Sequence, residues 1–540
     1  MPTVFGRRGY MAMQARRFWK TIPAAMNCCW FEYAEARMKK ATAEFLEKLD
    51  AAAEARRQAI LSAEDALEVS GQTYYVSNDG DDSADGCTPE TAWRTLARAG
   101  AAALRPGDGV RFRRGDLFRG QLIARPGVGY GAYGAGDKPR LYAWDFDLAD
   151  PELWELWDAA HHIWRLKVRT LDAGTLVFNG GEAHSRKLIP SYLNGRFVCR
   201  DRPDVPFDVA AEMTRDLDLF CAWCGRTTTV PSRGEDFPIP DFGPDALGEL
   251  YLRCDAGNPG EVWRSIELLA KRHLIRVGEC DDVHIDNLCL HYTGEHAISA
   301  GGSCVRGLTV TNCEIGWIGG SIQHYFGTDP NYPQGGRGTV TRYGNGVEIY
   351  GGCDGYRVEN CWIYQCYDAG VTHQISTFGQ NYQMNHVRYT GNLVENCVYS
   401  IEYFLEKTEP GESCMTDVEI DHNLLRYSGF GWGQQRHNTD TPAHIKGWSY
   451  ENTARSFRIH DNLFDRAACR MLHLVAKERE SLPEMSGNVY VQHMGATLGQ
   501  YGANRTGEPE MLIFDNKAYE AIARILKDAG AEVYEIEPEI

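Results

Sequence analysis

The chain has 540 residues, of which 43 % are hydrophobic and 11 % aromatic, a composition typical of folded proteins and not of disordered ones. Its formal net charge of -18 disfavours nucleic acid, anionic membranes and highly anionic polymers as partners, unless the 56 Lys and Arg residues form a local basic groove. The length suits two or three ordinary domains or one long repeat protein.

The first residues predict neither an export signal nor a membrane span. Residues 1–29 are partly basic but lack the uninterrupted apolar core of a signal peptide, and no run of about 18 apolar residues occurs. The 17 cysteines, an odd number, are therefore expected to be reduced thiols in a cytoplasmic protein. The only CxxC pair, Cys221 and Cys224, has no second pair beside it, which argues against a zinc or redox role.

Residues 30–69 predict a long amphipathic helix or a helical hairpin. The segment is nearly free of Gly and Pro, and apolar residues from Phe45 to Leu67 recur at helical spacing. This apolar face is shallow and rich in Ala, which suits packing on the protein body or on a partner chain better than lying on a membrane. We expect residues 1–70 to form a helical extension. Formation of a homo-oligomer through this extension is an open alternative.

A change of composition at Ser70 begins a second region. Two segments there, YYVSNDGDDSADGCTPETAWRTLARA from Tyr74 and LRPGDGVRFRRGDLFRG from Leu104, predict a strand, a turn-rich loop, a short helix and a tight turn into another strand. They resemble the N-terminal cap of carbohydrate-active right-handed parallel β-helix proteins of the pectin-lyase-like superfamily. Together with the strand repeats that follow from Leu274, the resemblance covers most of residues 74–495. It implies a right-handed parallel β-helix and a role in carbohydrate chemistry.

No cofactor is expected, although one loop leaves calcium open. The acidic loop Asp79–Asp85 has the oxygen density of a Ca²⁺ site. Loops of Asp and Gly are, however, more often plain turns. The less regular residues 140–270 are expected to hold strands of the early coils and an inserted flap around Asp201–Asp245.

From Leu274 a strand pattern repeats seven times, at intervals of 25 to 48 residues that fit one coil or one coil with a loop insertion. The copies start at Val283, Leu308, Tyr356, Val387, Val418, Phe457 and Pro483. The fifth residue of each copy is Asn, Gly, His or Asp, residue types that tolerate left-handed geometry at a bend. With the resemblance, this predicts an all-β solenoid, a right-handed parallel β-helix over residues 71–500, with a helix-and-strand cap over residues 501–540. The cysteines in the repeats are expected to be small buried fillers: Cys289, Cys313, Cys361, Cys366 and Cys397.

A column of outward side chains predicts the site, because equivalent strands of such a coil stack about 4.8 Å apart. Aligning the inward apolar residues gives the column Ser299, Gln323, Glu348, Thr372, Glu402 and His473. Glu348 and Glu402 are then two coils apart, roughly 9 to 10 Å at the backbone, which suits an inverting glycosidase better than a retaining one. We predict them as the catalytic pair, with the acid and base assignments undecided and with Asp368 able to replace either. A register error of one residue would weaken this inference.

Polar side chains beside the column are the predicted substrate contacts. Neutral hydrogen bonds to sugar hydroxyls are expected from Gln323, His324, Thr372, His373 and Gln374. Trp432 either stacks on a sugar or packs under a loop, and Arg436 lies on the same face. In the alternative interpretation, the glutamates are ordinary exposed strand residues and His373 is a hydrogen-bonded core histidine. Insertions at residues 325–343, 376–386 and 406–414 would wall the cleft.

These patterns favour an inverting glycoside hydrolase that cleaves an oligo- or polysaccharide with two carboxylates. A polysaccharide lyase is the alternative; it needs a Lys or Arg base, for which Arg436 and Lys446 are candidates. A non-catalytic glycan-binding solenoid is the third hypothesis.

Overall fold

The computed structural model describes residues 38–230, 235–326, 338–376, 380–406, 413–436, 442–503 and 510–537. All of them belong to one compact unit, Met38–Ile540. The first part of the predicted helical extension and parts of the three predicted cleft insertions lie outside the described residues.

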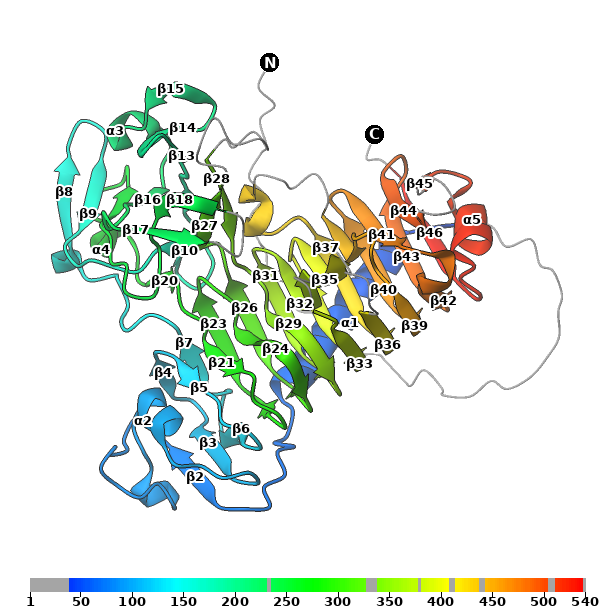
Figure 1. Ribbon diagram of the computed structural model, residues 1–540, viewed down its shortest axis with the longest axis horizontal. Helices are drawn as coiled ribbons and strands as arrows, with labels where there is room; N and C mark the ends of the chain where they lie inside the picture. Colours follow the sequence, from blue (N-terminus) through cyan, green and yellow to red (C-terminus); the bar gives the residue numbers. More distant parts are fainter. Residues whose placement is uncertain are drawn as a thin grey trace. The chain divides into compact units, whose positions relative to one another are not determined.

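Strands dominate this unit, and most of them stack in three parallel rows, one strand of each row per turn of the chain (Figure 1). The first row contains β5 (Leu122–Ile123), β21 (Ile275–Gly278), β24 (Ile298–Arg306), β29 (Val347–Asp354), β32 (Ala369–Ser376), β35 (Tyr399–Glu406), β38 (Ala443–Gly447), β41 (Arg470–Ala476) and β44 (Thr497–Ala503). The second contains β2 (Thr73–Val76), β3 (Gly109–Arg113), β6 (Gly129–Tyr133), β22 (His284–Asp286), β25 (Thr309–Thr311), β30 (Arg357–Glu359), β33 (Gln383–Thr390), β36 (Cys414–Asp421), β39 (Ala454–His460) and β42 (Glu484–Ser486). The third contains β4 (Leu117–Arg119), β7 (Arg140–Tyr142), β23 (Cys289–Thr293), β26 (Glu314–Ile318), β31 (Trp362–Cys366), β34 (Leu393–Glu395), β37 (Leu424–Ser428), β40 (Leu463–Ala467), β43 (Val489–His493), β46 (Glu532–Ile536) and β1 (Lys39–Lys40).

The seven predicted repeats are the second-row strands from β22 to β42, paired in the expected register. All seven fifth positions have a φ between 51° and 70°: Asn287, Asn312, Asn360, Gly391, His422, Asp461 and Gly487. Asn and Gly are favoured there because they enter this left-handed region at the least cost. The prediction of a bend at these positions is therefore confirmed.

Four side-chain amides line up inside the coils directly after these bends. Asn392 donates to Asn423 (3.0 Å), Asn423 to Asn462 (2.9 Å) and Asn462 to Asn488 (3.0 Å), and Asn488 in turn donates to Asp528 (2.8 Å). The ladder supplies the hydrogen bonds that buried amides need. Around it, one continuous apolar core runs from Val76 to Val533 and includes Cys313, Cys361, Cys366 and Cys397.

An inserted lobe interrupts the rows between β7 and β20 (Ile266–Ala270) (Figure 1). It contains β8 (Trp154–Asp158), β9 (Ile163–Leu166), β10 (Ala173–Phe178), β11 (Ala183–His184), β12 (Arg186–Lys187), β13 (Ser191–Leu193), β14 (Arg196–Cys199), β15 (Arg202–Pro206), α3 (Val209–Glu212), β16 (Asp218–Cys221), β17 (Thr227–Val230), β18 (Glu235–Pro240), β19 (Leu250–Arg253) and α4 (Pro259–Val262). The expectation of early-coil strands over residues 140–270 is wrong for most of that segment, since only β7, β10, β11 and β20 join the third-row sheet. Its short strands pair mostly antiparallel around a separate apolar core, so they need no stacking coil.

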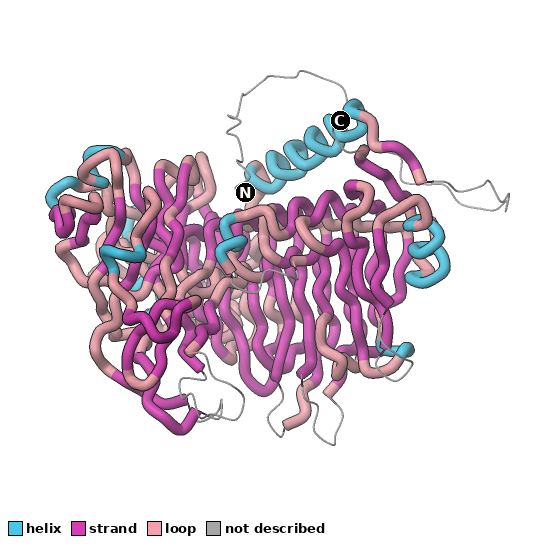
Figure 2. The backbone as a smooth tube through the Cα atoms, turned by 90° about the horizontal axis from the view of Figure 1, so that it is seen from above, coloured by secondary structure: helices cyan, strands magenta, loops and turns pink. Residues whose placement is uncertain are grey.

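One long helix, α1 (Ala43–Leu61), lies along the third row (Figure 2). Ala53 and Ile60 pack on third-row leucines, and Leu49 packs on Val491 and Ile536. The predicted packing of an Ala-rich helix on the protein body is confirmed for this part of the segment. Among the described helices, none is long and apolar enough to cross a membrane.

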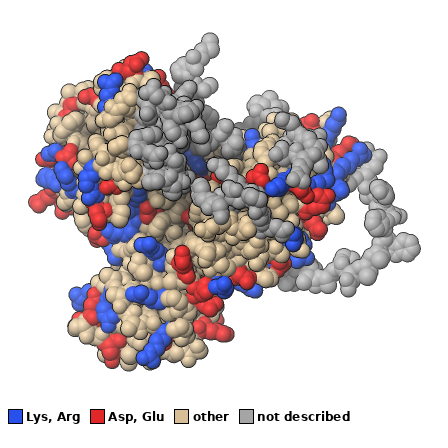
Figure 3. Space-filling model, viewed as in Figure 1, with Lys and Arg blue, Asp and Glu red and all other residues tan. Residues whose placement is uncertain are grey.

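The two ends of the stack are covered by smaller elements. At one end the acidic loop precedes α2 (Leu96–Ala101), and its carboxylates accept from backbone amides of the residues that follow it. Asp82 accepts from the amide of Arg94 at 2.7 Å, and Asp85 from that of Cys87 at 2.9 Å. At the other end β45 (Glu510–Ile513), α5 (Ala518–Ala521) and a π-helical turn precede β46. Apolar side chains of these last segments join the main core, as expected of a cap. Basic and acidic side chains are interspersed over the described part of the surface in Figure 3.

Candidate active site

A cleft of about 780 Å³ lies over the outward side chains of the first row. It adjoins a second hollow of about 810 Å³ that extends toward the inserted lobe. The two share the side chains His273, Ser299, Gln323, Tyr343, Glu348 and Tyr350.

Strand pairing fixes the column of side chains beneath the cleft. Read along the row, it runs Arg276, Ser299, Glu348, Thr372, Glu402, Lys446, His473 and Gln500. Glu348 and Glu402 therefore stand two strand spacings apart with Thr372 between them, as the sequence predicts. The predicted column is wrong at Gln323, since β24 pairs directly with β29, and it omits Lys446.

Gln323 lies instead on β27 (Ile322–Phe326), which pairs antiparallel with β28 (Thr339–Arg342). A buried ion pair between Asp172 and Lys187 (2.6 Å) anchors the start of this hairpin, because Asp172 also accepts from the amide of Ile322 at 2.6 Å. Gln323 still lines both hollows, and the neighbouring His324 lines the one toward the lobe. The hairpin thus brings Gln323 to the cleft and His324 to the adjoining hollow.

Glu348 is 6 % exposed and is held by neutral hydrogen-bond donors. The side chains of Asn345 (2.5 Å) and Gln374 (2.9 Å) donate to Oε2, and His296 Nε2 lies 3.1 Å from Oε1. The amide of Asn345 donates to His296 Nδ1 at 3.0 Å, which places the imidazole proton on Nε2, facing Glu348. Thr372 holds Gln374 in this position, since its hydroxyl donates to the side-chain amide oxygen of Gln374 at 3.0 Å.

Burial raises the pKa of Glu348 to about 7, and the charge of Asp368 acts in the same direction while the two amide donors oppose it. Burial also lowers the pKa of His296 to about 4, so this imidazole is neutral beside Glu348 near pH 7. A carboxyl that titrates near neutrality can hold a proton and release it. Glu348 therefore has the environment of a general acid.

Glu402 is equally buried, at 5 % exposed, but it has a cationic partner. Its Oε1 lies 3.2 Å from the ammonium of Lys446 and accepts from the indole of Trp448 at 3.0 Å. Burial raises the pKa of Glu402, and Lys446 opposes this effect. The cation favours the ionised form, which a general base needs.

The third predicted carboxylate, Asp368, forms an ion pair with Arg436 at the same cleft. Both side chains are less than one-fifth exposed. The ring of Tyr399 lies below two cations of the cleft, with its centroid 3.6 Å from the Lys446 ammonium and 5.5 Å from the Arg436 guanidinium. The predicted grouping of Glu348, Asp368, Glu402 and Arg436 is thus observed.

Three predicted contacts do not line the cleft, and the first of them, Thr372, is fully buried beneath it. His373 is fully buried in the core, where it is hydrogen-bonded to Tyr389 at 2.8 Å and stacks on Tyr403. This matches the alternative interpretation of a core histidine, so its prediction as a sugar contact is corrected. Trp432 is 3 % exposed and donates to the carbonyl of Gln365 at 2.7 Å, so it packs under a loop and offers no sugar platform.

The sequence does not reveal several residues that the structure brings to the cleft. His296 and Asn345 precede β24 and β29 and carry no local signal of convergence. Trp448, tilted against Phe404 at 4.7 Å between ring centroids, supplies the aromatic surface expected of Trp432. The place of Lys446 in the column could be predicted from the sequence, because the preceding residue, Ile445, continues the inward apolar positions of the first row.

Comparisons with known proteins give likeness in structure alone. No protein-family model and no curated protein sequence matches the chain. The chain is similar to a structure described as a glycoside hydrolase, with 12 % identity and a TM-score of 0.39 over 86 % of this chain and 96 % of the other. It is also similar to a lacto-N-biosidase from Eubacterium ramulus (11 % identity, TM-score 0.31, 92 % and 71 % covered) and to a rhamnogalacturonan lyase (8 %, 0.30, 86 % and 87 %).

The similar structures are carbohydrate-active enzymes. This is the same broad class of protein as the one that residues 74–495 resemble in sequence. At these identities and TM-scores the likeness carries no argument about activity, and the chemistry follows from the chain's own residues.

Proposed function

We propose that the chain is a glycoside hydrolase on a right-handed parallel β-helix, cleaving a glycosidic bond in an oligo- or polysaccharide with inversion. The handedness is the one that parallel crossover connections adopt almost without exception. The observation that carries the proposal is the pair of buried carboxylates at the cleft, one held by neutral donors and the other beside a cation.

In this mechanism Glu348 donates a proton to the leaving oxygen of the glycosidic bond. Its pKa of about 7 leaves about half of the side chains protonated at pH 7. Glu402, whose ionised form the neighbouring Lys446 favours, takes a proton from the water that attacks the anomeric carbon. The sugar leaves with a free reducing end, and the two carboxyls exchange their protonation states until solvent restores them.

The spacing of the pair supports inversion over retention. Glu348 and Glu402 are separated by the whole of β32, roughly 9 to 10 Å at the backbone. An inverting enzyme needs roughly 6.5 to 9.5 Å between carboxyl groups to admit water, whereas a retaining enzyme needs about 5 to 5.5 Å. Asp368 is the alternative base, because its carboxylate lines the same cleft, where it is paired with Arg436.

A glycan-library screen with the full chain tests this proposal by new reducing ends. Against a glycan that is cleaved, Glu348→Gln and Glu402→Gln are each expected to lower kcat by roughly 10²- to 10⁴-fold, the usual contribution of general acid-base catalysis. Glu359→Gln, on β30 of the second row, is the matched control and is expected to retain activity. Wild-type kcat in both cleft variants would reject the pair.

A polysaccharide lyase is the second candidate, favoured by the position of Lys446 in the column. Burial is the largest effect and lowers the pKa of Lys446, but Glu402, Tyr399 and Asp368 together raise it above the ordinary value, which is unfavourable for a base. A lyase would release an unsaturated product that absorbs in the ultraviolet and would lose activity in Lys446→Met. A chain that binds glycans in the screen but turns none over would instead be a binding protein.

A further inference from the structure

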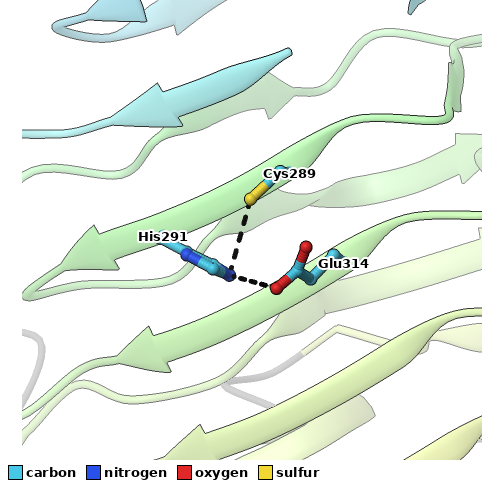
Figure 4. Close-up of side chains that lie close together, drawn as sticks. All are labelled: Cys289, His291 and Glu314. Carbon is cyan, nitrogen blue, oxygen red and sulfur yellow. Dashed lines mark hydrogen bonds and ion pairs between the residues drawn. The ribbon is translucent and has the colours of Figure 1, made fainter. Parts of the chain in front are cut away.

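A second cluster of chemically active side chains lies on the outward side of the third row. Cys289 and His291 are two residues apart on β23, and pairing with β26 places Glu314 beside Cys289. Figure 4 shows His291 directed between the other two side chains. Its Nε2 is 3.6 Å from the thiol of Cys289 and 3.2 Å from a carboxylate oxygen of Glu314.

A fourth polar atom reaches the same point from the next strand. The hydroxyl of Tyr364, on β31, is 3.1 Å from His291 Nε2 and donates to Glu314 at 3.1 Å. It reaches them across Gly316, where an added Cβ would lie 2.5 Å from the tyrosine ring. The glycine therefore makes room for the arrangement, which brings together side chains of three successive turns of the chain.

We propose that Cys289, His291 and Glu314 bind a Zn²⁺ ion. Zinc bonds of about 2.3 Å to sulfur, 2.0 to 2.1 Å to nitrogen and 2.0 to 2.2 Å to oxygen, at tetrahedral angles, set their ligand atoms about 3.4 to 3.6 Å apart. The sulfur–nitrogen and nitrogen–oxygen separations of 3.6 and 3.2 Å are already close to this geometry, and the three ligand atoms all lie within 4.8 Å of one another. One side chain would need only a small movement.

Charge and hydrogen bonding agree with a cation at this point. A thiolate and a carboxylate would balance the two charges of the ion, and the neutral imidazole would add a third ligand. Without an ion, the sulfur, the carboxylate and the phenol converge on one ring nitrogen, which has a single proton or a single lone pair to offer. The fourth position is filled by Tyr364 or by water.

The site has a structural role in this proposal, because it would tie β23 to β26 about 4.8 Å away and is separate from the cleft. The prediction that Cys289 is only a buried filler is revised accordingly. Within the described residues, Cys289, His291 and Glu314 form a group in which three potential ligand atoms converge.

Metal binding by the full chain, stripped with a chelator and free of affinity histidines, tests the proposal. One equivalent of Zn²⁺ is expected by elemental analysis. Co²⁺ in its place is expected to give a sulfur-to-metal charge-transfer band with the visible spectrum of tetrahedral cobalt. Cys289→Ser should abolish the charge-transfer band, and His291→Ala should weaken Zn²⁺ binding by at least about 100-fold, since even outer-shell changes cost 10- to 100-fold.

Cys87→Ser, in a loop of the cap, is the matched thiol control and is expected to bind like the wild type. Equal metal-free melting temperatures of the wild type and Cys289→Ser would exclude misfolding as the cause of lost binding. No binding by the wild type, or an unchanged charge-transfer band in Cys289→Ser, would overturn the proposal. Neither result bears on hydrolysis, which Glu348→Gln tests separately.

Discussion

Replacing Glu348 by Gln is expected to stabilise the protein in a way that grows with pH. Burial raises the pKa of Glu348 from its ordinary 4.5 to about 7, so between these values the folded chain binds a proton that the unfolded chain has lost. Stability falls with pH wherever the folded state binds more protons, so ionising Glu348 destabilises the wild type. Gln cannot ionise and is free of this cost.

The size of the effect follows from the pKa difference of about 2.5, at 1.36 kcal/mol for each pKa unit. The free energy of unfolding of Glu348→Gln relative to wild type should therefore rise by roughly 3 kcal/mol between pH 4 and pH 8. Any constant cost from altered hydrogen bonds to Asn345 and Gln374 cancels in this comparison.

Urea unfolding of both chains at a series of pH values measures the difference. Glu484→Gln, on the exposed edge of β42, controls for the change in net charge. A difference between Glu348→Gln and wild type that is flat from pH 4 to pH 8, or that falls, would refute the assignment of a neutral-range carboxyl to Glu348.

Three further changes test other parts of the account. Lys446→Met removes the cation beside Glu402, so the acidic limb of kcat/KM against pH should move to higher pH; an unmoved limb would speak against Glu402 as the base. Asp172→Asn breaks a buried ion pair with Lys187 and should lower the free energy of unfolding by about 3 to 5 kcal/mol, whereas an unchanged urea midpoint would show that the pair is dispensable. Ile60→Ala on α1 should cost about 2 to 5 kcal/mol, and an unaltered melting curve would mean that the helix adds nothing to the packed body.

The repeat and the catalytic column could be predicted because both follow from the two-residue period of strands. Val347, Val371 and Ile401 point inward, and that alternation alone places Glu348 and Glu402 on the outer face. The same alternation also argues against His373 as a sugar contact. Because Thr372 points outward, the next residue, His373, must point into the core.

Prediction from the sequence fails where the chain leaves the repeating coil. The longest interval between repeats holds an excursion that includes β27 and β28, so Ile322 looks like an inward coil residue although its strand belongs to a hairpin. His296 reaches Glu348 only because two successive turns of the chain stack, and no single segment of the sequence indicates that contact. The inserted lobe has no repeat to reveal its pairing.

The most direct test of the central claim is the configuration of the newly formed reducing end, followed by NMR from the first minutes of cleavage of a glycan that the chain hydrolyses. Inversion is expected, because Glu348 and Glu402 stand two strand spacings apart, which suits the carboxyl separation of an inverting enzyme. Retention of configuration, or an unsaturated product, would contradict it.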